Sequence, residues 1–574
     1  MHAPSTSPSA SPLASRRAAA EYPLHVKRTT LINIDALQAL ATYPPEVAER
    51  NDHSLRWITD PSLYEPVAAQ AGPQPWTSAP YTVLSSADVR VMLDHGVIRR
   101  IAPADVRGPM RLFAVTEEAK RRRRPIRWTT LINDVLGRDT LIPLDMARKC
   151  DIIALVRTGS HAIAFDAKAF FDQFELHPDI GAHMCFKKGR NFFCATRAAM
   201  GQRQSVEVAH TTMQRIVQDP ERECYSAVII NNAIFVGDRD ACVRDGKRFV
   251  ERCRRVGCDL NENTGDIDAL VTQQIEWGGV ALDFAKKTTR LTARMVDKIA
   301  LSRSLRERWT LKGYVSHMGL LFWTLGLVCS CAADFFVALN FYAAVCCEFS
   351  IASALPDYDK KRFWSQSVFL PEPVLESIRA WTEQALRNVP RKVPKQLDRA
   401  DMPDWLVCVD ASREGFGYVA VAPRTGETRF FGEPWPDDFR RQHGMRLRQS
   451  VFTEPEAAVR SMCHLLSYDP NRVVNVHIWT DSVTTMSSIN KGFNARSEHI
   501  NEAVRRLRAI FPAPSADHSG GFVFTCAHIP GKDDVVADAL SRGKRVTFSD
   551  IEGAAAQMHS MFGGEAASSD FVGS

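Results

Sequence analysis

The chain has 574 residues, of which 45% are hydrophobic and 24% are charged, and this predicts a globular protein of several domains rather than a disordered one. Lys and Arg outnumber Asp and Glu by 72 to 66, so the net charge of +6 favours a polyanionic partner only weakly. The fourteen cysteines show no zinc-type spacing and no secretory signal is evident, which predicts reduced thiols in an intracellular protein.

The N-terminal residues 1–25 are rich in Ser, Ala and Pro and contain a single acid, Glu21. This composition predicts disorder, and we expect a disordered or extended tail over residues 1–50. Organellar transit peptides have a similar composition, although no amphipathic helix bearing arginine is evident here. A mitochondrial location is therefore an alternative to a cytoplasmic or nuclear one.

Strand-like and helix-like segments alternate over residues 51–295. They include a basic block at residues 120–124 and the segment HAIAFDAKAFFDQFEL, which predicts a buried strand that ends at Asp166 and turns into a helix. An acid at the end of a strand often caps the next helix, so Asp166 alone gives little support for a site.

A largely helical region is expected over residues 296–387. It contains the most apolar stretch of the chain, residues 314–346, which His317, Asp334 and Asn340 interrupt. A membrane span needs roughly 18 to 20 uninterrupted apolar residues, so this stretch predicts buried helices of a connecting domain and no membrane anchor. A polar linker with several prolines, residues 388–404, then predicts a domain boundary.

A second α/β pattern covers residues 405–545, and four acids lie at its strand ends and helix starts. The apolar run WLVCVD ends at Asp410, and the strand VVNVHIWTD ends at Asp481. Thr453 is a good N-cap and would place Glu454 at a helix start, while Asp538 lies on the last helix, in DDVVADALSR. The composition of the remaining residues, 546–574, predicts a flexible tail.

Paired divalent cations explain why four acids would gather in one α/β unit. Two Mg²⁺ ions about 4 Å apart repel each other unless several anionic oxygens surround them. Such a pair clamps the attacking water and the leaving oxygen of a phosphodiester, and Mn²⁺ is an alternative to Mg²⁺. Each acid alone is more simply a helix cap, so the order of the four carries the hypothesis.

The short sequence motifs around these acids are, in chain order, DAS, GFG, TEPEA, TDS and HIPGKDDVVADALSR. In this order they closely resemble the ribonuclease H domain of retroelements. The resemblance implies hydrolysis of the RNA strand of an RNA–DNA hybrid, and it implies that four acids bind the metal ions: Asp410, Glu454, Asp481 and Asp538.

Three neighbouring residues qualify this resemblance. Glu456 is an alternative to Glu454, although the E-x-x-A pattern of the family fits at position 454. Lys532 follows Gly531, where cellular members of the family often carry a histidine that helps product release. His528 precedes that glycine and is expected to be structural.

Further short sequence motifs resemble those of the fingers and palm of a reverse transcriptase, over roughly residues 80–295. They are GVI at 96–98, LIN at 131–133, FFCATRAAMG at 192–201 and QIEWGG at 274–279. The resemblance implies that Asp166 is a metal-binding acid of the palm and that Phe171 excludes a ribose 2′-hydroxyl. It also implies that Arg127 and the basic block meet a triphosphate, and that Gly201 and Gln202 lie along the template and nucleotide. A solvated loop is the alternative for the arginine run.

The palm hairpin departs from the family pattern, which has an aromatic residue, a variable residue and two aspartates. Here Asn231 and Asn232 occupy the two aspartate positions, after Ile229 and Ile230. Asn-Asn is a good two-residue turn, so the hairpin is expected to keep its shape. The charge is lost, and Asp166 is left as the single carboxylate for two divalent cations.

No other acid is expected to compensate for this loss. Asp238 and Asp240 lie at least six residues beyond the turn, which is about 20 Å along a strand. The segment at residues 261–264 also lacks the lysine that the family carries there. These two losses predict a polymerase that is impaired or inactive.

We therefore expect a multidomain α/β and α+β chain with right-hand polymerase fingers and palm, a helical thumb or connection, and a ribonuclease H-like mixed α/β domain. Its expected partners are RNA, DNA and RNA–DNA hybrids, and nothing in the sequence indicates an oligomeric state. A domesticated, catalytically inactive RNA- or hybrid-binding protein or assembly factor is the alternative. With no protease or integrase motif evident, the chain resembles DIRS, Ngaro and VIPER elements somewhat more than Gypsy-like ones.

Overall fold

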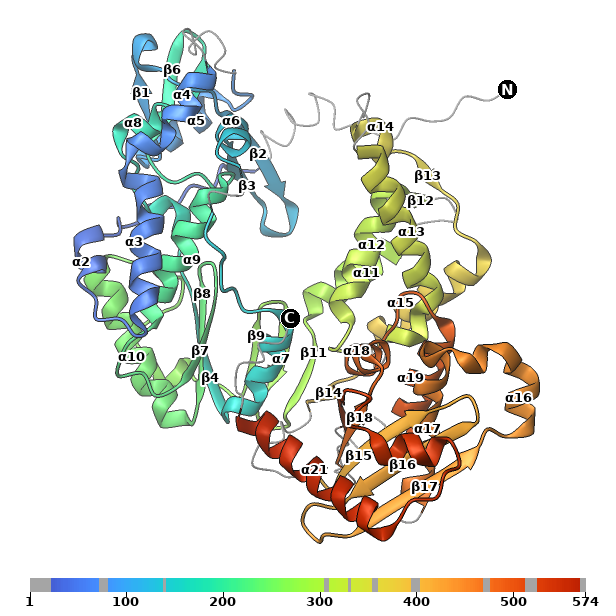
Figure 1. Ribbon diagram of the computed structural model, residues 1–574. Coiled ribbons are helices and arrows are strands. Elements are labelled where there is room, and N and C mark those ends of the chain that lie inside the picture. Colours follow the sequence, from blue (N-terminus) through green and yellow to red (C-terminus); the bar gives the residue numbers. More distant parts are fainter. Residues whose placement is uncertain are drawn as a thin grey trace, which may run out of the picture. The chain divides into compact units, whose positions relative to one another are not determined.

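The computed structural model describes residues 22–71, 81–137, 141–303, 309–328, 332–353, 360–393, 403–467, 475–510 and 524–567. The chain divides into two compact units, Met1–Gly278 and Gly279–Ser574. Figure 1 colours the first unit from blue to green and the second from yellow-green to red. Both units combine helices and strands, as the mixed α/β expectation requires.

Helices begin early in the first unit, which corrects the expectation of a disordered or extended tail over residues 1–50. The N-terminal helices are α2 (Ile34–Gln38) and α3 (Pro45–Thr59). Helix α3 starts with a proline, which is tolerated there because the first amide has no partner within the helix. It buries Leu55, Trp57 and Ile58 and packs on α9 (Arg203–Val217). Residues 1–21 lie outside the described residues.

Two small antiparallel sheets follow. Strands β1 (Ile98–Ile101), β6 (Asn191–Ala195) and β5 (Cys185–Lys188) form the first, in the order β1-β6-β5. Strands β2 (Arg111–Glu117) and β3 (Arg122–Trp128) form a hairpin that carries the basic block at its turn. The neighbouring helices are α4 (Glu65–Ala71), α5 (Ser86–Asp94), α6 (Thr130–Val135), α7 (Lys149–Thr158) and α8 (Pro178–Gly181).

A three-stranded antiparallel sheet forms the centre of the first unit. Its order is β4-β8-β7, from β4 (His161–Asp166), β8 (Asn232–Gly237) and β7 (Tyr225–Ile229). Phe165 of β4 and Phe235 of β8 pack with Phe249 of α10 (Arg239–Val256), and these rings are almost fully buried. Strands β4 and β8 pair with Asp166 opposite Asn232, so these two polar residues lie side by side at one end of the sheet. Strand β9 (Gln274–Trp277) ends the unit.

Helices dominate the first part of the second unit, as expected. They are α11 (Ala293–Arg303), α12 (Leu311–Thr324), α13 (Phe336–Ser353), α14 (Lys360–Trp364) and α15 (Glu372–Arg387). Trp381 stacks on Phe335, with ring centroids 4.7 Å apart, and its indole N–H donates to the Thr324 hydroxyl at 3.1 Å. Short strands accompany these helices: β10 (Val280–Asp283), β11 (Thr288–Leu291), β12 (Trp309–Thr310), β13 (Ser367–Val368) and β14 (Arg391–Lys392).

The long apolar stretch forms two separate helices, α12 and α13, and the polar His317 within it has hydrogen-bond partners. His317 is 1% exposed, and its two ring nitrogens lie 2.7 Å and 3.1 Å from the hydroxyls of Ser302 and Thr382. Within the described ranges, no helix has both the length and the apolar character needed to cross a membrane.

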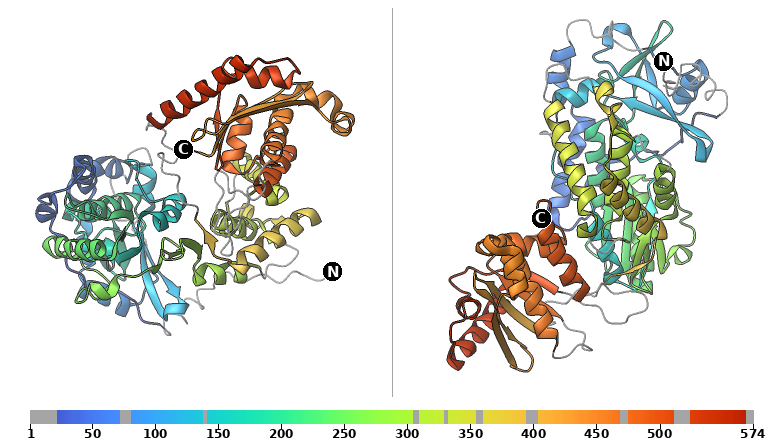
Figure 2. Two further views of the ribbon diagram at one scale, coloured as in Figure 1. Left: turned by 90° about the horizontal axis from the view of Figure 1, so that it is seen from below. Right: turned by 90° about the vertical axis from the view of Figure 1, so that its right-hand side faces the viewer.

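A five-stranded sheet forms the second half of this unit, in the order β17-β16-β15-β18-β19. Strands β15 (Trp405–Ala411), β16 (Gly415–Val421) and β17 (Thr428–Pro434) are antiparallel, while β18 (Val476–Thr480) and β19 (Phe524–His528) run parallel to β15. One face packs on α17 (Ser450–Ser467) and α19 (Glu498–Ile510), the other on α20 (Val535–Ser541) and α21 (Phe548–Ala567). The left view of Figure 2 shows the sheet between these layers. Helices α16 (Asp437–His443) and α18 (Val483–Lys491) complete the unit.

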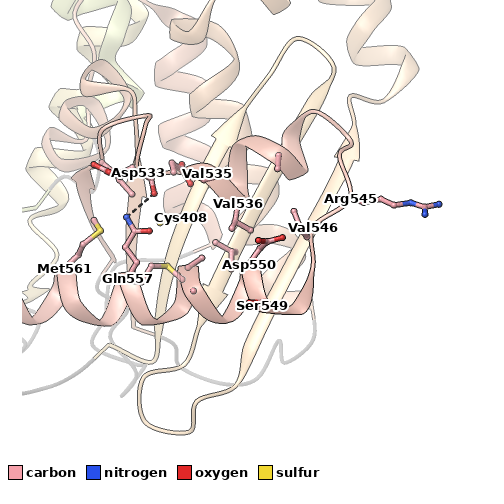
Figure 3. Close-up of a pocket in the computed structure, with 17 residues that line it drawn as sticks. Cys408, Asp533, Val535, Val536, Arg545, Val546, Ser549, Asp550, Gln557 and Met561 are labelled. Carbon is pink, nitrogen blue, oxygen red and sulfur yellow. Dashed lines mark hydrogen bonds between the residues drawn. The ribbon is translucent and has the colours of Figure 1, made fainter.

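Helix α21 corrects the expectation of a flexible tail over residues 546–574. Ile551 and Met558 are 3% and 1% exposed, and they join the buried cluster under β15 and β16. Ala554, Ala555 and Phe562 pack against the same cluster, so the apolar residues recur at helical spacing. A pocket of about 420 Å³ remains between α20, α21 and the sheet, and the Gln557 amide donates to the Asp533 carbonyl at 3.2 Å across it (Figure 3).

We expect a chain that ends at Arg545 to lose about 2 kcal/mol of stability in its second unit, because two buried side chains of α21 would no longer cover the sheet. Urea unfolding followed by tryptophan fluorescence, to which the fully buried Trp479 of this cluster contributes, measures the loss. A chain that ends at Ala567 keeps all of these contacts and is the control. Equal unfolding midpoints for the two truncations would contradict the role given to α21.

Candidate active sites

Strand register brings two acids of the second unit together. Strands β15 and β18 are parallel neighbours with Val409 opposite Thr480, so Asp410 and Asp481 follow at adjacent positions. Glu454 of α17 joins them from the helical layer. One carboxylate oxygen from each of these three acids lies within 4.8 Å of the others. The geometry therefore unites three of the four acids that the sequence singles out.

Glu454 is held firmly in this group. It is 1% exposed, and its carboxylate accepts hydrogen bonds from the Ala411 amide at 3.0 Å and the Thr480 hydroxyl at 3.1 Å. Burial, and then the charges of Asp410 and Asp481, raise the pKa of Glu454 well above its usual range. Helix α17 begins at Ser450, so the expected N-cap Thr453 instead lies inside the helix, and its hydroxyl donates to the Gln449 carbonyl.

Glu456, the alternative to Glu454, has different partners. Its buried carboxylate accepts hydrogen bonds from Arg460 and Arg506, both at 2.7 Å. It is thus committed to an ion-pair network and does not belong to the three-acid group.

We expect Glu456→Gln to keep the Mg²⁺ affinity of the three-acid group within about threefold of the unsubstituted chain while lowering stability by about 1–2 kcal/mol. The stability loss is modest because Arg460 and Arg506 are 26% and 43% exposed and can be rehydrated. Mg²⁺ titration and urea unfolding measure the two effects. Glu454→Gln is the matched comparison, and the assignment of the two glutamates would be reversed if it were the harmless variant.

Asp538 lies beside the three acids but outside their group. It is on α20, and its carboxylate pairs with Arg542 at 2.6 Å. The charge of Asp538 contributes to the raised pKa values of Asp410 and Asp481, after burial as the main cause. Its place is therefore consistent with a fourth acid at the edge of the site.

Asp534 also lies at this site, although it is not among the four acids that the sequence patterns indicate. This residue lies just before α20, is 3% exposed, and has one oxygen without a hydrogen-bond partner in the described part of the chain. Burial first, and then the charges of Asp410, Asp481 and Asp538, raise the pKa of Asp534 well above its usual range. The Asp-Asp doublet at 533–534 was the available signal.

His528 lies at the rim of the same site. The side chain is exposed, and Nε2 donates to the Asp481 carbonyl at 3.1 Å, so the ring is a neighbour of the acids. Burial raises the pKa of Asp481, and the charge of His528 opposes that increase. The structural role expected for His528 from the sequence stays a prediction.

The three acids fit a hard divalent cation. The atoms that they offer to a metal are all oxygens. Burial and the nearby acids raise the pKa of Asp410 to about 6, although its hydrogen bond from the Ser541 hydroxyl opposes the increase. Several of these carboxylates raise one another's pKa because little positive charge lies among them. A cation would relieve this repulsion.

The surroundings of Asp166 in the first unit are organised differently. Asp166 ends β4, and each of its two oxygens accepts a hydrogen bond from an amide: one from Asn231, the other from Asn261 at 2.7 Å. Asn232 donates in turn to the Asn231 side-chain oxygen at 3.1 Å. Each oxygen of the carboxylate therefore has one neutral amide donor as its partner.

The hairpin turn differs from the expected one by one residue. Ile229 pairs with Asn232, so the two turn residues are Ile230 and Asn231 rather than Asn231 and Asn232. Ile230 has a positive φ of 56°, a strained conformation for a β-branched residue.

A second acid lies near Asp166, which corrects the expectation of a single carboxylate. Both oxygens of Glu262 are 3.1 Å from the Asp166 backbone amide, and Glu262 is absent from the lining of the cavity in front of Asp166. Asp238 caps α10 at the other end of β8, as the strand distance predicts. Asn261 and Glu262 come from a loop far along the chain, so no local pattern marks them.

This cavity has a volume of about 570 Å³, and its lining includes Asp166, Phe171 and Arg127. Arg127 is 5% exposed and forms an ion pair with Asp172. Gly201 packs so closely on the Arg127 carbonyl that a Cβ atom would lie 2.6 Å from it.

Gly201 and Gln202 are both outside the lining of this cavity, unlike Asp166, Phe171 and Arg127. Gln202 is buried, and its side-chain amide donates to the Tyr64 hydroxyl at 2.7 Å.

No protein-family model matches the chain, and no curated protein matches it. Among solved structures, it is similar to a foamy viral protease-reverse transcriptase in complex with double-stranded DNA, with 10% identity and a TM-score of 0.44 over 88% of this chain and 99% of that one. The dRH form of that protein with double-stranded DNA gives 11% identity and a TM-score of 0.43 over 88% and 83%.

A third structure, the same viral protein with an RNA/DNA hybrid, gives 13% identity and a TM-score of 0.40 over 77% of this chain and 52% of that one. Such low TM-scores establish neither a family nor an activity, so the chemistry has to be judged from the residues of the chain.

Proposed function

We propose that the second unit cleaves the RNA strand of RNA–DNA hybrids in a Mg²⁺-dependent reaction, and that the first unit no longer synthesises DNA. The observation that carries the nuclease proposal is the convergence of Asp410, Glu454 and Asp481 within 4.8 Å. The choice of a hybrid as substrate rests on the resemblance of the sequence motifs around these acids to those of retroelement ribonuclease H.

Each residue of this site has a definite contribution. Asp410, Glu454 and Asp481 would hold the ions, which when bound supply an activated water and positive charge at the leaving oxygen. Glu454 also joins β15 to the helical layer through its bond with Ala411, so its orientation is fixed before any ligand arrives. His528 is exposed beside Asp481, and its Nε2 donates to the Asp481 carbonyl at the rim of the site.

The loss of DNA synthesis follows from the amides around Asp166. Neutral Asn231 and Asn232 replace two anionic ligands, and metal catalysis worth several kcal/mol corresponds to about tenfold in rate for each 1.4 kcal/mol lost. A protein that only binds nucleic acid is the second candidate, and the basic hairpin β2–β3 favours it because phosphate contacts alone provide affinity.

One gel distinguishes these candidates. The purified chain is incubated with Mg²⁺, dNTPs and an end-labelled RNA–DNA hybrid that has a recessed primer. We expect the RNA to be cleaved and the primer to stay unextended. Primer extension would overturn the proposal for the first unit, and salt-sensitive binding with neither reaction would favour the binding protein.

A further inference from the structure

The pocket between α20, α21 and the sheet contains a buried carboxyl group that lacks a full set of partners. Asp534 lines this pocket, is 3% exposed, and its Oδ2 atom accepts no hydrogen bond from any described residue. A buried polar atom without a partner is costly, and a bound ion or molecule is one way in which such an atom is satisfied. Asp534 therefore indicates a ligand that donates a hydrogen bond.

The charges around the pocket favour a donor that is also a cation. Among the described residues that line it are three acids, Asp533, Asp534 and Asp550, and one base, Arg545. Arg545 is exposed, and Figure 3 shows its side chain extending away from the other labelled residues. After burial, the charges of nearby acids raise the pKa of Asp534 because they oppose its ionisation. A cation bound beside this carboxyl group would offset that repulsion.

The walls of the pocket are apolar and rich in sulfur. Val419 of β16 and Val536 of α20 line it, and both are buried. Cys408 of β15 lines it as well, together with Met558 and Met561 of α21. Methionine adapts to the shape of a ligand, and its sulfur makes favourable contacts with aromatic rings. These walls therefore suit an aromatic body beside the polar group of Asp534.

The volume of the pocket indicates a small organic molecule. About 420 Å³ lies within the range of roughly 300–1,000 Å³ that is typical of cavities for such ligands. The hydrogen bond from the Gln557 amide to the Asp533 carbonyl connects α21 to the loop before α20 beside the pocket. At Gly553, which also lines the pocket, a Cβ atom would have no neighbouring heavy atom within 4 Å. A ring with a short chain therefore has room here.

We propose that this pocket binds an organic ammonium ion with an aromatic body, and that Asp534 is its counter-charge. The ammonium group donates to the free Oδ2 atom, and the ring contacts the side chains of Met558 and Met561. The inference does not rest on the proposed nuclease, because none of the acids Asp410, Glu454 and Asp481 lines the pocket.

Isothermal titration calorimetry of the full chain with phenethylamine, at pH 7 in EDTA, tests the proposal. The expected dissociation constant is about 1 mM or lower. Phenethyl alcohol keeps the ring without the charge, and ethylamine keeps the charge without the ring. Each is expected to bind at least about tenfold more weakly, because each lacks one of the two contacts. No binding of phenethylamine at about 10 mM, or equal affinities of the amine and the alcohol, would overturn the proposal.

A pair of matched variants locates the amine. Asp534→Asn keeps the shape of the side chain and removes its charge, so it is expected to weaken phenethylamine binding at least about tenfold. The urea unfolding midpoint of this variant is expected not to fall, because a buried charge is costly and asparagine is neutral. Asp481→Asn makes the same change outside the pocket lining, and it is expected to keep the affinity within about threefold.

The other results of this comparison contradict the proposal. Equal weakening by Asp534→Asn and Asp481→Asn would place the amine at the three-acid group, and unchanged binding by Asp534→Asn would place it elsewhere on the chain. Either result would leave the nuclease proposal intact, because that proposal is tested by cleavage of a hybrid in Mg²⁺.

Discussion

The variant Asp481→Asn is expected to reduce Mg²⁺-dependent cleavage of an RNA–DNA hybrid by at least about 100-fold, since each lost 1.4 kcal/mol of transition-state stabilisation is tenfold in rate. Asp481 follows β18 directly, and an oxygen of its carboxylate lies within 4.8 Å of oxygens from Asp410 and Glu454. Asparagine keeps the shape and one oxygen but removes the charge. Initial rates on an end-labelled hybrid, over a range of Mg²⁺ concentrations, give the size of the loss.

The control for this experiment is Asp533→Asn, a change of the same chemistry in the loop before α20. The Asp533 backbone carbonyl contacts Gln557, and its side chain is outside the three-acid group, so cleavage is expected to stay within about twofold. Unchanged unfolding midpoints for both variants would exclude a loss of fold. If Asp481→Asn cleaved the hybrid as fast as Asp533→Asn, the active site would have to be elsewhere.

The acids of the second unit could be located from the sequence because local patterns fix them. WLVCVD is a short apolar run ending in an acid, and the parallel pairing of β15 with β18 then brings Asp410 next to Asp481. The E-x-x-A pattern already favours Glu454 over Glu456, and the structure adds the partners that distinguish these two buried residues of α17. The roles of the four acids in catalysis stay predictions.

The surroundings of Asp166 could not be found in this way. Asn261 and Glu262 reach Asp166 across 95 and 96 positions of the sequence, and no periodicity links residues so far apart. The hairpin turn was placed one residue late because Asn-Asn has the better turn propensity, whereas the pairing of Ile229 with Asn232 sets the register.

Composition was misleading at both ends of the chain. The Gly, Ala and Ser of residues 546–574 suggested a tail, but Ile551 and Met558 lie seven positions apart and face the same buried cluster in α21. The spacing of a few apolar residues therefore predicts the structure of this segment better than its average composition does. Likewise, residues 45–59 form a helix because Leu55, Trp57 and Ile58 have a neighbour, α9, to pack on.

The stability of the second unit without divalent ions is expected to fall as the pH rises from about 4 to about 6. Burial, opposed by the Ser541 hydrogen bond and increased by nearby acids, raises the pKa of Asp410 from 3.8 to about 6. The folded unit thus binds more protons than the unfolded chain in this window, so stability decreases as the pH rises through it. For Asp410 alone the shift corresponds to about 3 kcal/mol.

Asp410→Asn removes this titration, so in EDTA the variant is expected to lose less stability between pH 5 and pH 7 than the unsubstituted chain. The charge of Asp410 also raises the pKa values of Glu454 and Asp534, so the difference between the urea unfolding free energies of the two proteins measures Asp410 together with its coupling to these two acids. Asp533→Asn serves again as the control and is expected to follow the unsubstituted chain.

The effect of Mg²⁺ on stability at different pH values tests the metal site without an activity measurement. A cation binds the ionised acids of the folded unit, so Mg²⁺ is expected to stabilise the unsubstituted chain at pH 7 far more than at pH 5. Asp410→Asn is expected to show little stabilisation at either pH. Equal stabilisation of both proteins would mean that Mg²⁺ binds elsewhere, and the raised pKa values would then reflect burial of acids that serve no metal.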